Sequence, residues 1–172
     1  MTLCLQPCGT NHPPTGGVRY PCVPAGPGGQ AAVGGRQANI VSRIVLFLPA
    51  MLLAVLHRHG GLALGDQDVF VNVVGGVRVT ETAADLAVLL AVMSSYRNRA
   101  LPADLIVFAE VGLSGELRPV PNGQARLHEA VKHGFHQAII PAGNKPRRPP
   151  EGLEVAALPR LSQVLERISE QF

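Results

Sequence analysis

Hydrophobic periodicity divides the chain into two parts. From residue 50 onward, apolar residues recur at the three-to-four-residue spacing of helices and the two-residue spacing of strands. The first 49 residues are rich in Gly and Pro and show neither period. We therefore expect a disordered or non-native segment at 1–49 and a folded domain at 50–172.

The periods predict helices and strands in alternation. Strands are expected at 68–74, 104–111, 136–141 and 153–158, with a turn and a partner strand at 112–120. Helices are expected at 50–59 with a stop at Gly60-Gly61, from Thr82 to the polar segment before Pro102, at 122–134 and at 160–172. This order predicts an α+β fold, an α/β sandwich in which helices cover one sheet.

The turn before the second of these helices allows two interpretations. Gly75-Gly76 interrupts an apolar strand, and Thr82 and Asp85 fit a capping box in which the Thr82 hydroxyl accepts an early backbone N–H. Four apolar residues then follow at the spacing of a buried helix face: Leu86, Leu89, Leu90 and Met93. Enzymes often place a nucleophile or a phosphate-binding loop at such a turn, so an active site and a capped core helix are both candidates.

Charge and cysteine are unevenly distributed. The net charge of +3 lies in the first 49 residues, which contain three Arg, no acidic residue and all three Cys. Cys4, Cys8 and Cys22 lack the paired spacing of a closed zinc site even with His12 as a fourth ligand, so we expect free thiols. The most apolar run, at 44–56, is shorter than the about 20 residues of a membrane span, so we expect no membrane segment and a cytoplasmic location.

Motifs of common enzymes are missing or broken. The chain contains no P-loop, so we expect it not to bind ATP by itself. His128 and His133 are five residues apart and cannot share a metal on one helix face. Ser114 lacks the second glycine of the G-x-S-x-G motif, so we expect a hairpin turn there.

Basic residues are better candidates for contact than for catalysis. Six of them lie on or near the helix at 122–134 and are candidate contacts to nucleic-acid phosphates: Arg118, Arg126, Lys132, Lys145, Arg147 and Arg148. An ordinary solvated surface is the alternative, because residues 50–172 contain equal numbers of basic and acidic residues.

A family resemblance rests on four segments, at residues 52–62, 66–95, 115–135 and 138–144. They read LLAVLHRHGGL, DQDVFVNVVGGVRVTETAADLAVLLAVMSS, GELRPVPNGQARLHEAVKHGF and AIIPAGN. Together they resemble the C-terminal Lon-like domain of bacterial DNA repair proteins of the RadA (Sms) family. The resemblance extends from about Ala50 almost to the last residue, and it implies the fold of the Lon proteolytic domain, which is related to domain 2 of ribosomal protein S5.

The same resemblance bears on catalysis. Lon-type proteases use a serine at the start of the helix after the Gly-Gly strand, and a lysine on a later helix takes its proton. The resemblance places Ala83 at the serine position and Gln124 at the lysine position. Alanine has no oxygen to attack with and glutamine cannot accept the proton, so the resemblance implies degenerate positions and no catalytic residue.

The function that the resemblance implies is a non-catalytic scaffold and DNA-contact module of a RadA-type DNA repair ATPase, acting in homologous recombination and branch migration. Its expected partners are DNA, through the full-length protein, and further copies of itself in a hexameric ring. ATP, Mg and Zn are expected only in the N-terminal domains of such a protein. Two alternatives stay open: a Lon-like ATP-dependent serine peptidase domain, and the Lon-like domain of a ComM-like or magnesium-chelatase-like ATPase.

The resemblance stops abruptly near Ala50. Because the preceding residues have an excess of Gly, Pro, Ala, Arg and Cys, we expect segment 1–49 to be an out-of-frame reading of upstream coding sequence. Such a shift would remove two strands and their buried side chains, which predicts an exposed sheet edge and poor solubility.

Overall fold

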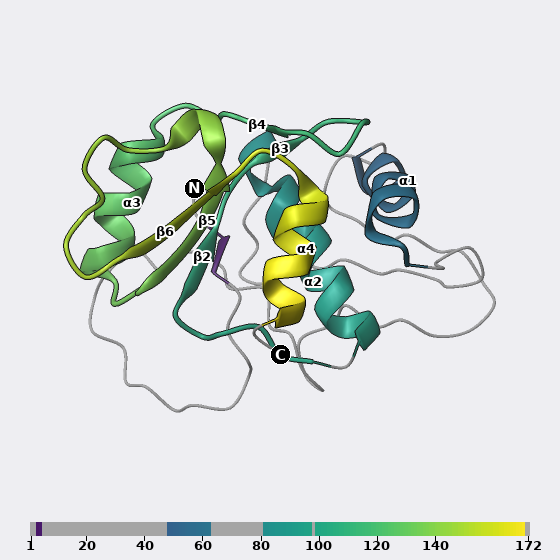
Figure 1. Cartoon of the computed structure of the whole chain (residues 1–172), viewed down its shortest axis with the longest axis horizontal. Coiled ribbons are helices and arrows are strands. Elements are labelled where there is room, and N and C mark those ends of the chain that lie inside the picture. The colour runs from purple at the N-terminus through teal and green to yellow at the C-terminus, as the bar shows by residue number, and fades with distance from the viewer. Residues whose placement is uncertain (1–2, 5–47, 63–80, 98, 171–172) are drawn as a thin grey trace.

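A computed structural model of the chain describes residues 3–4, 48–62, 81–97 and 99–170 (Figure 1). The predicted strand at 68–74 and the Gly75-Gly76 break lie outside these residues, as do most of the residues of segment 1–49. The domain boundary and the disorder predicted for that segment therefore stay predictions.

The main sheet has four strands in the order β1-β2-β5-β6. They are β1 (Leu3–Cys4), β2 (Leu105–Val107), β5 (Gln137–Pro141) and β6 (Glu154–Leu158). Strands β2, β5 and β6 are parallel, whereas β1 runs antiparallel to β2. The strands predicted at 136–141 and 153–158 are confirmed as β5 and β6.

Two layers of core form on opposite faces of this sheet, because side chains alternate along each strand. Along β2 and β5, Ile106 and Ile140 belong to one buried cluster, whereas Val107 and Ile139 belong to the other. The helices α1 (Leu48–Gly60), α2 (Asp85–Arg97) and α4 (Leu161–Glu170) supply the cluster of Val107, and α3 (Gly123–Lys132) supplies that of Ile106 (Figure 1). Helices therefore cover both faces, which confirms an α+β fold at the level of a helix-covered sheet.

The four predicted helices are all present. Leu127 of α3 is fully buried, and Gly134 follows the helix with φ +80°, a left-handed conformation that favours glycine. Helix α1 ends at Gly60, as predicted, and begins two residues before the expected domain boundary, with Pro49 in its first turn where proline is tolerated. None of the described helices is long and apolar enough to cross a membrane.

Helix α2 is buried around most of its circumference. Every residue from Leu86 to Met93 is at most 6% exposed, although only one face was predicted to be buried. It packs against α1 and the hairpin strand β3 (Glu110–Val111), and its side chains share a core with α4 and the sheet. A helix that is apolar on all sides is a central core helix, so α2 fixes the positions of the elements around it.

The predicted strand at 104–111 is in fact two strands in two sheets, so the prediction of one strand is wrong. Strand β2 belongs to the main sheet, whereas β3 forms an antiparallel hairpin with β4 (Leu117–Arg118), which confirms the predicted partner strand. Between them, Ala109 donates its N–H to Ala83 O at 3.1 Å and accepts the N–H of Leu86 at 3.3 Å. The apolar run continues through this change of partner, so hydrophobicity alone does not reveal the break.

Candidate functional site

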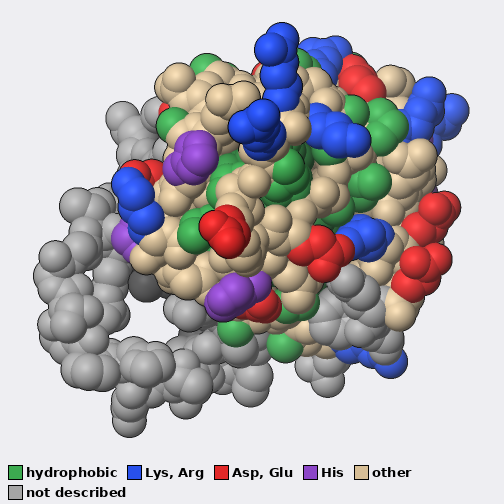
Figure 2. All heavy atoms as spheres, turned by 60° about the vertical axis from the view of Figure 1, so that its left-hand side comes forward, with side chains coloured by type: hydrophobic (Ala, Val, Ile, Leu, Met, Phe, Trp, Pro, Cys, Tyr) green, Lys and Arg blue, Asp and Glu red, His purple; other side chains and the backbone are tan. Residues whose placement is uncertain are grey.

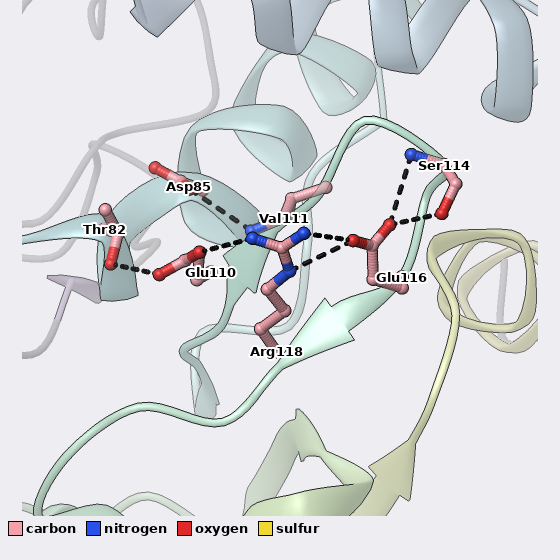
Figure 3. A network of polar contacts seen from close by, with 7 residues as sticks. All are labelled: Thr82, Asp85, Glu110, Val111, Ser114, Glu116 and Arg118. Carbon is pink, nitrogen blue, oxygen red and sulfur yellow. Dashed lines mark hydrogen bonds and ion pairs between the residues drawn. The ribbon is translucent and has the colours of Figure 1, made fainter.

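The turn that leads into α2 is not capped as the sequence predicted. A short 3-10 turn, η1 (Thr82–Ala84), precedes the helix, and its N-cap residue Glu81 makes no side-chain capping bond. The Thr82 hydroxyl donates to Glu110 Oε2 at 2.9 Å instead of accepting a backbone N–H (Figure 3). The predicted capping box is therefore wrong, because the Glu110 carboxylate from β3 lies within reach and accepts the hydrogen bond of the Thr82 hydroxyl.

Asp85 is the buried acid of this turn. The residue is only 2% exposed, and its Oδ2 accepts the N–H of Val111 at 3.2 Å (Figure 3). Oδ1 has no hydrogen-bond partner among the described residues. Burial raises the pKa of Asp85 to about 6; the Val111 bond opposes this rise and the Glu110 charge adds to it. Burial thus outweighs the favourable effect of the helix N-terminus on a carboxylate.

Arg118 of the β3–β4 hairpin pairs with two carboxylates of the same hairpin. Arg118 lies 2.7 Å from Glu116 Oε1 and 3.2 Å from Glu110 Oε1, and Ser114 donates its hydroxyl and its N–H to Glu116 Oε2 (Figure 3). The Ser114 hydroxyl, together with Arg118, lowers the pKa of Glu116 to about 2. Ser114 therefore acts in a hairpin turn, as predicted, and the charge of Arg118 is balanced locally.

The two residues that the family resemblance places at the Lon dyad positions lie on neighbouring elements. Ala83 in η1 is 4% exposed and belongs to the same core cluster as Phe108 and Leu127. Gln124 is exposed in the first turn of α3. The assignment of these residues to a former dyad stays a prediction, because it depends on the family resemblance alone.

An ion pair joins the two elements that hold these positions. Arg126 Nη2 of α3 donates to Glu81 Oε2 at 2.8 Å, immediately before η1, and Arg126 Nε donates to Pro121 O at 3.2 Å. The guanidinium also lies 6.0 Å from the centroid of the Phe108 ring, within the range of a cation–π contact. The Arg126 hydrogen bond lowers the pKa of Glu81. Arg126 is 7% exposed, so it acts as an internal link between α3 and η1.

The six predicted DNA-contact residues thus separate into two groups. Arg118, Arg126 and Lys132 each have an acidic partner, which for Lys132 is Glu129 at 2.8 Å. The other three lie on the loop after β5, are exposed, and take part in no ion pair within the described residues: Lys145, Arg147 and Arg148. We call these three residues the basic loop.

Two open hollows lie where the basic loop meets the start of α3. One, of about 420 Å³, is lined by Gln124 and His128 on the helix side and by Arg147 and Arg148 on the loop side. The other, of about 610 Å³, includes Lys145 and again Gln124 and His128. Figure 2 turns this side of the molecule forward and shows Lys and Arg side chains gathered along its upper edge. The arrangement offers positive charge to an anionic ligand at a concave surface.

Asn144 fixes the start of the basic loop. Its side-chain amide makes two hydrogen bonds to the backbone of Val120, as a neighbouring strand would. Oδ1 accepts Val120 N–H at 2.8 Å, and Nδ2 donates to Val120 O at 2.9 Å. It also lies over Gly123, where an added Cβ would be 2.5 Å from Asn144 Nδ2. We call this arrangement of Asn144, Val120 and Gly123 the Asn144 clamp, and it holds the loop against the first turn of α3.

Sequence reasoning missed the partners that decide these roles. The acids Glu81, Glu110 and Glu116 were not identified as ion-pair partners, and Asn144 was placed in a polar loop without a role. The only local signal of an ion pair was the spacing of Glu116 and Arg118, which are two residues apart and therefore on the same face of a strand. Among the described residues, no three His, Cys, Asp or Glu side chains form a potential metal site.

Comparison with known proteins gives one family match and several similar proteins. Residues 52–144 match the family described as "Subunit ChlI of Mg-chelatase". The chain is also similar to several proteins named DNA repair protein RadA. That of Pseudomonas aeruginosa is 67% identical over 121 residues, which are 70% of this chain and 27% of the relative.

Relatives from other bacteria give the same result. The RadA of Escherichia coli is 66% identical over 116 residues, covering 67% of this chain and 25% of the relative. That of Mycobacterium tuberculosis is 41% identical over 116 residues, covering 67% and 24%. These identities confirm the resemblance that the sequence segments predicted. The chain spans about a quarter of the length of these relatives.

The buried acid of α2 predicts a pH-dependent stability that Asp85→Asn removes. Folding raises the pKa of Asp85 from 3.8 to about 6, so the folded chain binds more protons than the unfolded chain in this window. The stabilising effect of the protonated carboxyl is complete below pH 3.8 and is lost as the pH rises through about 6. We expect the wild type to lose roughly 3 kcal/mol relative to Asp85→Asn across the window, measured by urea denaturation. Identical pH slopes for the two chains would contradict this prediction.

The Asn144 clamp predicts that Gly123→Ala destabilises the fold, although alanine is the better helix former. The new methyl group must displace Asn144 and weaken its bonds to Val120, at a cost of about 1–3 kcal/mol in the free energy of unfolding. Gln124→Ala, at the exposed neighbouring position, is the control and should change stability by less than about 0.5 kcal/mol. In a double-mutant cycle, Gly123→Ala should cost less in an Asn144→Ala background; strictly additive costs would refute the clamp.

Proposed function

The chain belongs to the family of subunit ChlI of Mg-chelatase, and we propose that it is the non-catalytic, Lon-like scaffold and DNA-contact module of a RadA-type DNA repair protein. The proposal assigns the domain to the Lon and ribosomal protein S5 domain 2 fold class and to the cytoplasm. In this proposal the domain acts in the cytoplasm, in homologous recombination and branch migration, as part of a hexameric ring. ATP, Mg and Zn chemistry belongs to other domains of such a protein. The names of the relatives support the repair role.

The basic loop is the observation that carries the DNA-contact part of this proposal. Lys145, Arg147 and Arg148 are exposed and have no ion-pair partner among the described residues, so their charges are available to phosphates. Arg118 and Lys132 have carboxylate partners, and Arg126 is buried against Glu81. We therefore narrow the six candidate DNA-contact residues to the three of the basic loop.

Three features support a non-catalytic role. Ala83 carries no nucleophile and is nearly inaccessible, so a substrate carbonyl could not approach this position. Gln124 lies at the surface with an amide that cannot act as a base. The Thr82 hydroxyl beside Ala83 donates to a carboxylate, and no lysine among the described residues bonds to it.

The family description also raises one alternative, the Lon-like domain of a ComM-like or magnesium-chelatase-like ATPase. The match over residues 52–144 favours it. We rank it second, because relatives of 66–67% identity carry the name DNA repair protein RadA.

DNA binding by the chain tests the leading proposal. We expect the purified chain to bind labelled DNA with an affinity that falls as salt rises, measured by fluorescence anisotropy. Replacing Lys145, Arg147 and Arg148 by Gln should weaken binding and reduce the slope of log affinity against log salt by about 0.7–0.9 for each phosphate that the variant no longer neutralises.

The matched control removes three exposed cations elsewhere: Arg58→Gln, Lys132→Gln and Arg160→Gln. It has the same net charge as the basic-loop variant, so non-specific attraction changes equally in both. Equal salt slopes for the two triple variants would show that the basic loop makes no specific contact, and no binding by the wild type would refute the proposal.

A peptide-cleavage assay tests the non-catalytic part separately. We expect no cleavage of casein above background, because neither former dyad position has a reactive group. Ala83→Ser combined with Gln124→Lys is an informative companion variant. Cleavage by the wild-type chain that a serine-directed inhibitor abolishes would favour the Lon-like serine peptidase instead.

A further inference from the structure

Strand β6 leaves one edge of the main sheet open. It is the last strand in the order β1-β2-β5-β6, and no strand of the described residues pairs with its outer side (Figure 1). On its inner side, the N–H of Glu154 donates to His136 O at 2.8 Å. Because the backbone groups of alternate residues point to opposite sides of a strand, Val155 and Ala157 direct their N–H and C=O groups away from β5.

The side chains of this edge do not protect it. Natural edge strands commonly carry lysine, proline or a bulge that prevents pairing with another chain. Strand β6 reads EVAAL, so its one charge stands at the first residue, and the four residues after it are apolar and half-buried. The edge therefore favours the addition of another strand.

The two ends of this edge limit how another strand can pair with it. The N–H of Leu153 is already bonded within the preceding turn. Pro159 has no N–H, and its O accepts the N–H of Leu117 at 2.9 Å. An added strand can thus bond only to the outward groups of Val155 and Ala157.

We propose that β6 pairs with β6 of a second copy of the chain, antiparallel and about a two-fold axis at Ala156. In this register Val155 lies opposite Ala157 of the second copy, and the same pair recurs on the other side of the axis. Each pair exchanges two N–H···O bonds, so all outward groups of both strands are satisfied. Two-fold registers centred on Val155 or on Ala157 would instead require the committed backbone groups of Leu153 or Pro159.

Side chains at the axis and at the ends of the paired strands are complementary. Ala156 meets its own copy across the axis, where two methyl groups fit the short distance of a non-hydrogen-bonded pair. Glu154, which also pairs with Arg167, lies opposite Leu158 of the second copy. Arg160 of that copy follows on the same face, within the diagonal reach of a long side chain. Because Arg160 is exposed and takes part in no ion pair within the described residues, its charge is available to Glu154 of the other copy.

This interface goes beyond the proposed function. A two-fold interface closes at two copies, whereas a ring of six copies needs a head-to-tail interface between two different surfaces. The pairing of β6 is therefore separate from ring formation, and it would join two chains or two rings.

Cross-linking tests the position of the two-fold axis. The test uses a chain in which the native cysteines are replaced by serine: Cys4, Cys8 and Cys22. We expect Ala156→Cys to give a covalent dimer under mild oxidation, because the two Cα atoms would lie about 4.5 Å apart, within disulfide range. Ala157→Cys in the same background is the matched control, since a valine of the second copy lies opposite it. Equal cross-linking of both variants, or none by Ala156→Cys, would overturn the pairing.

Sedimentation of the purified chain measures the assembly without a cross-link. We expect Val155→Pro to halve the mass of the wild-type species, because proline removes an outward N–H and none of the bonds to β5. Arg160→Glu should weaken association about fivefold or more. Arg58→Glu makes the same charge change at an exposed site on α1 and should alter association far less. Urea denaturation verifies that each variant is folded.

These results decide the inference independently of DNA binding and of ring formation. A wild-type chain that sediments as a monomer up to about 1 mM would overturn the pairing. An assembly whose mass neither Val155→Pro nor Arg160→Glu changes would also overturn it, and the proposed ring and DNA contact would still stand. A cross-link through Ala156→Cys, together with a halved mass in Val155→Pro, would establish the interface.

Discussion

The burial of α2 on nearly all sides is the constraint on which the rest of the structure depends. A helix with no solvent face must have every neighbour in place, and the sheet, α1, α4 and the β3–β4 hairpin provide those neighbours. Its N-terminus is buried too, so the chain entering it must satisfy backbone groups without water. The backbone of Ala109 satisfies two of these groups, because it donates to Ala83 O and accepts from Leu86 N–H. These two hydrogen bonds are the reason the apolar segment at 104–111 divides into two strands.

The burial of α2 also determines how the polar and charged side chains near its N-terminus are paired. Thr82 and Asp85 face the hairpin instead of their own helix, so the hairpin and α2 are joined through side chains that local sequence would assign to capping. The carboxylates of Glu110 and Glu116 then require Arg118 nearby, which keeps that arginine from serving as a free surface cation. The burial of helix α2 therefore determines which partners Arg118 has at the surface.

The sequence was sufficient for the helices and for the parallel strands β5 and β6, because each has a clear period and all of them except α4 are followed by a glycine or proline stop. The sequence did not predict the contacts of polar side chains that can bond either to a local or to a distant partner. Thr82 can cap a helix or reach Glu110, and only the tertiary position of β3 decides between them. The basic candidates show the same limit, since Arg126 reads as a solvated helix residue until Glu81, 45 positions earlier, is placed beside it.

The proline-rich loop after β5 has a consequence for any ligand that it meets. Pro146, Pro149 and Pro150 restrict the backbone around Arg147 and Arg148, and Asn144 anchors the segment to Val120. Much of the conformational entropy of this loop is therefore already lost on folding, before a ligand arrives. Association then has to order little more than the two arginine side chains, so even a few charge-assisted contacts can yield measurable affinity from a small, shallow surface.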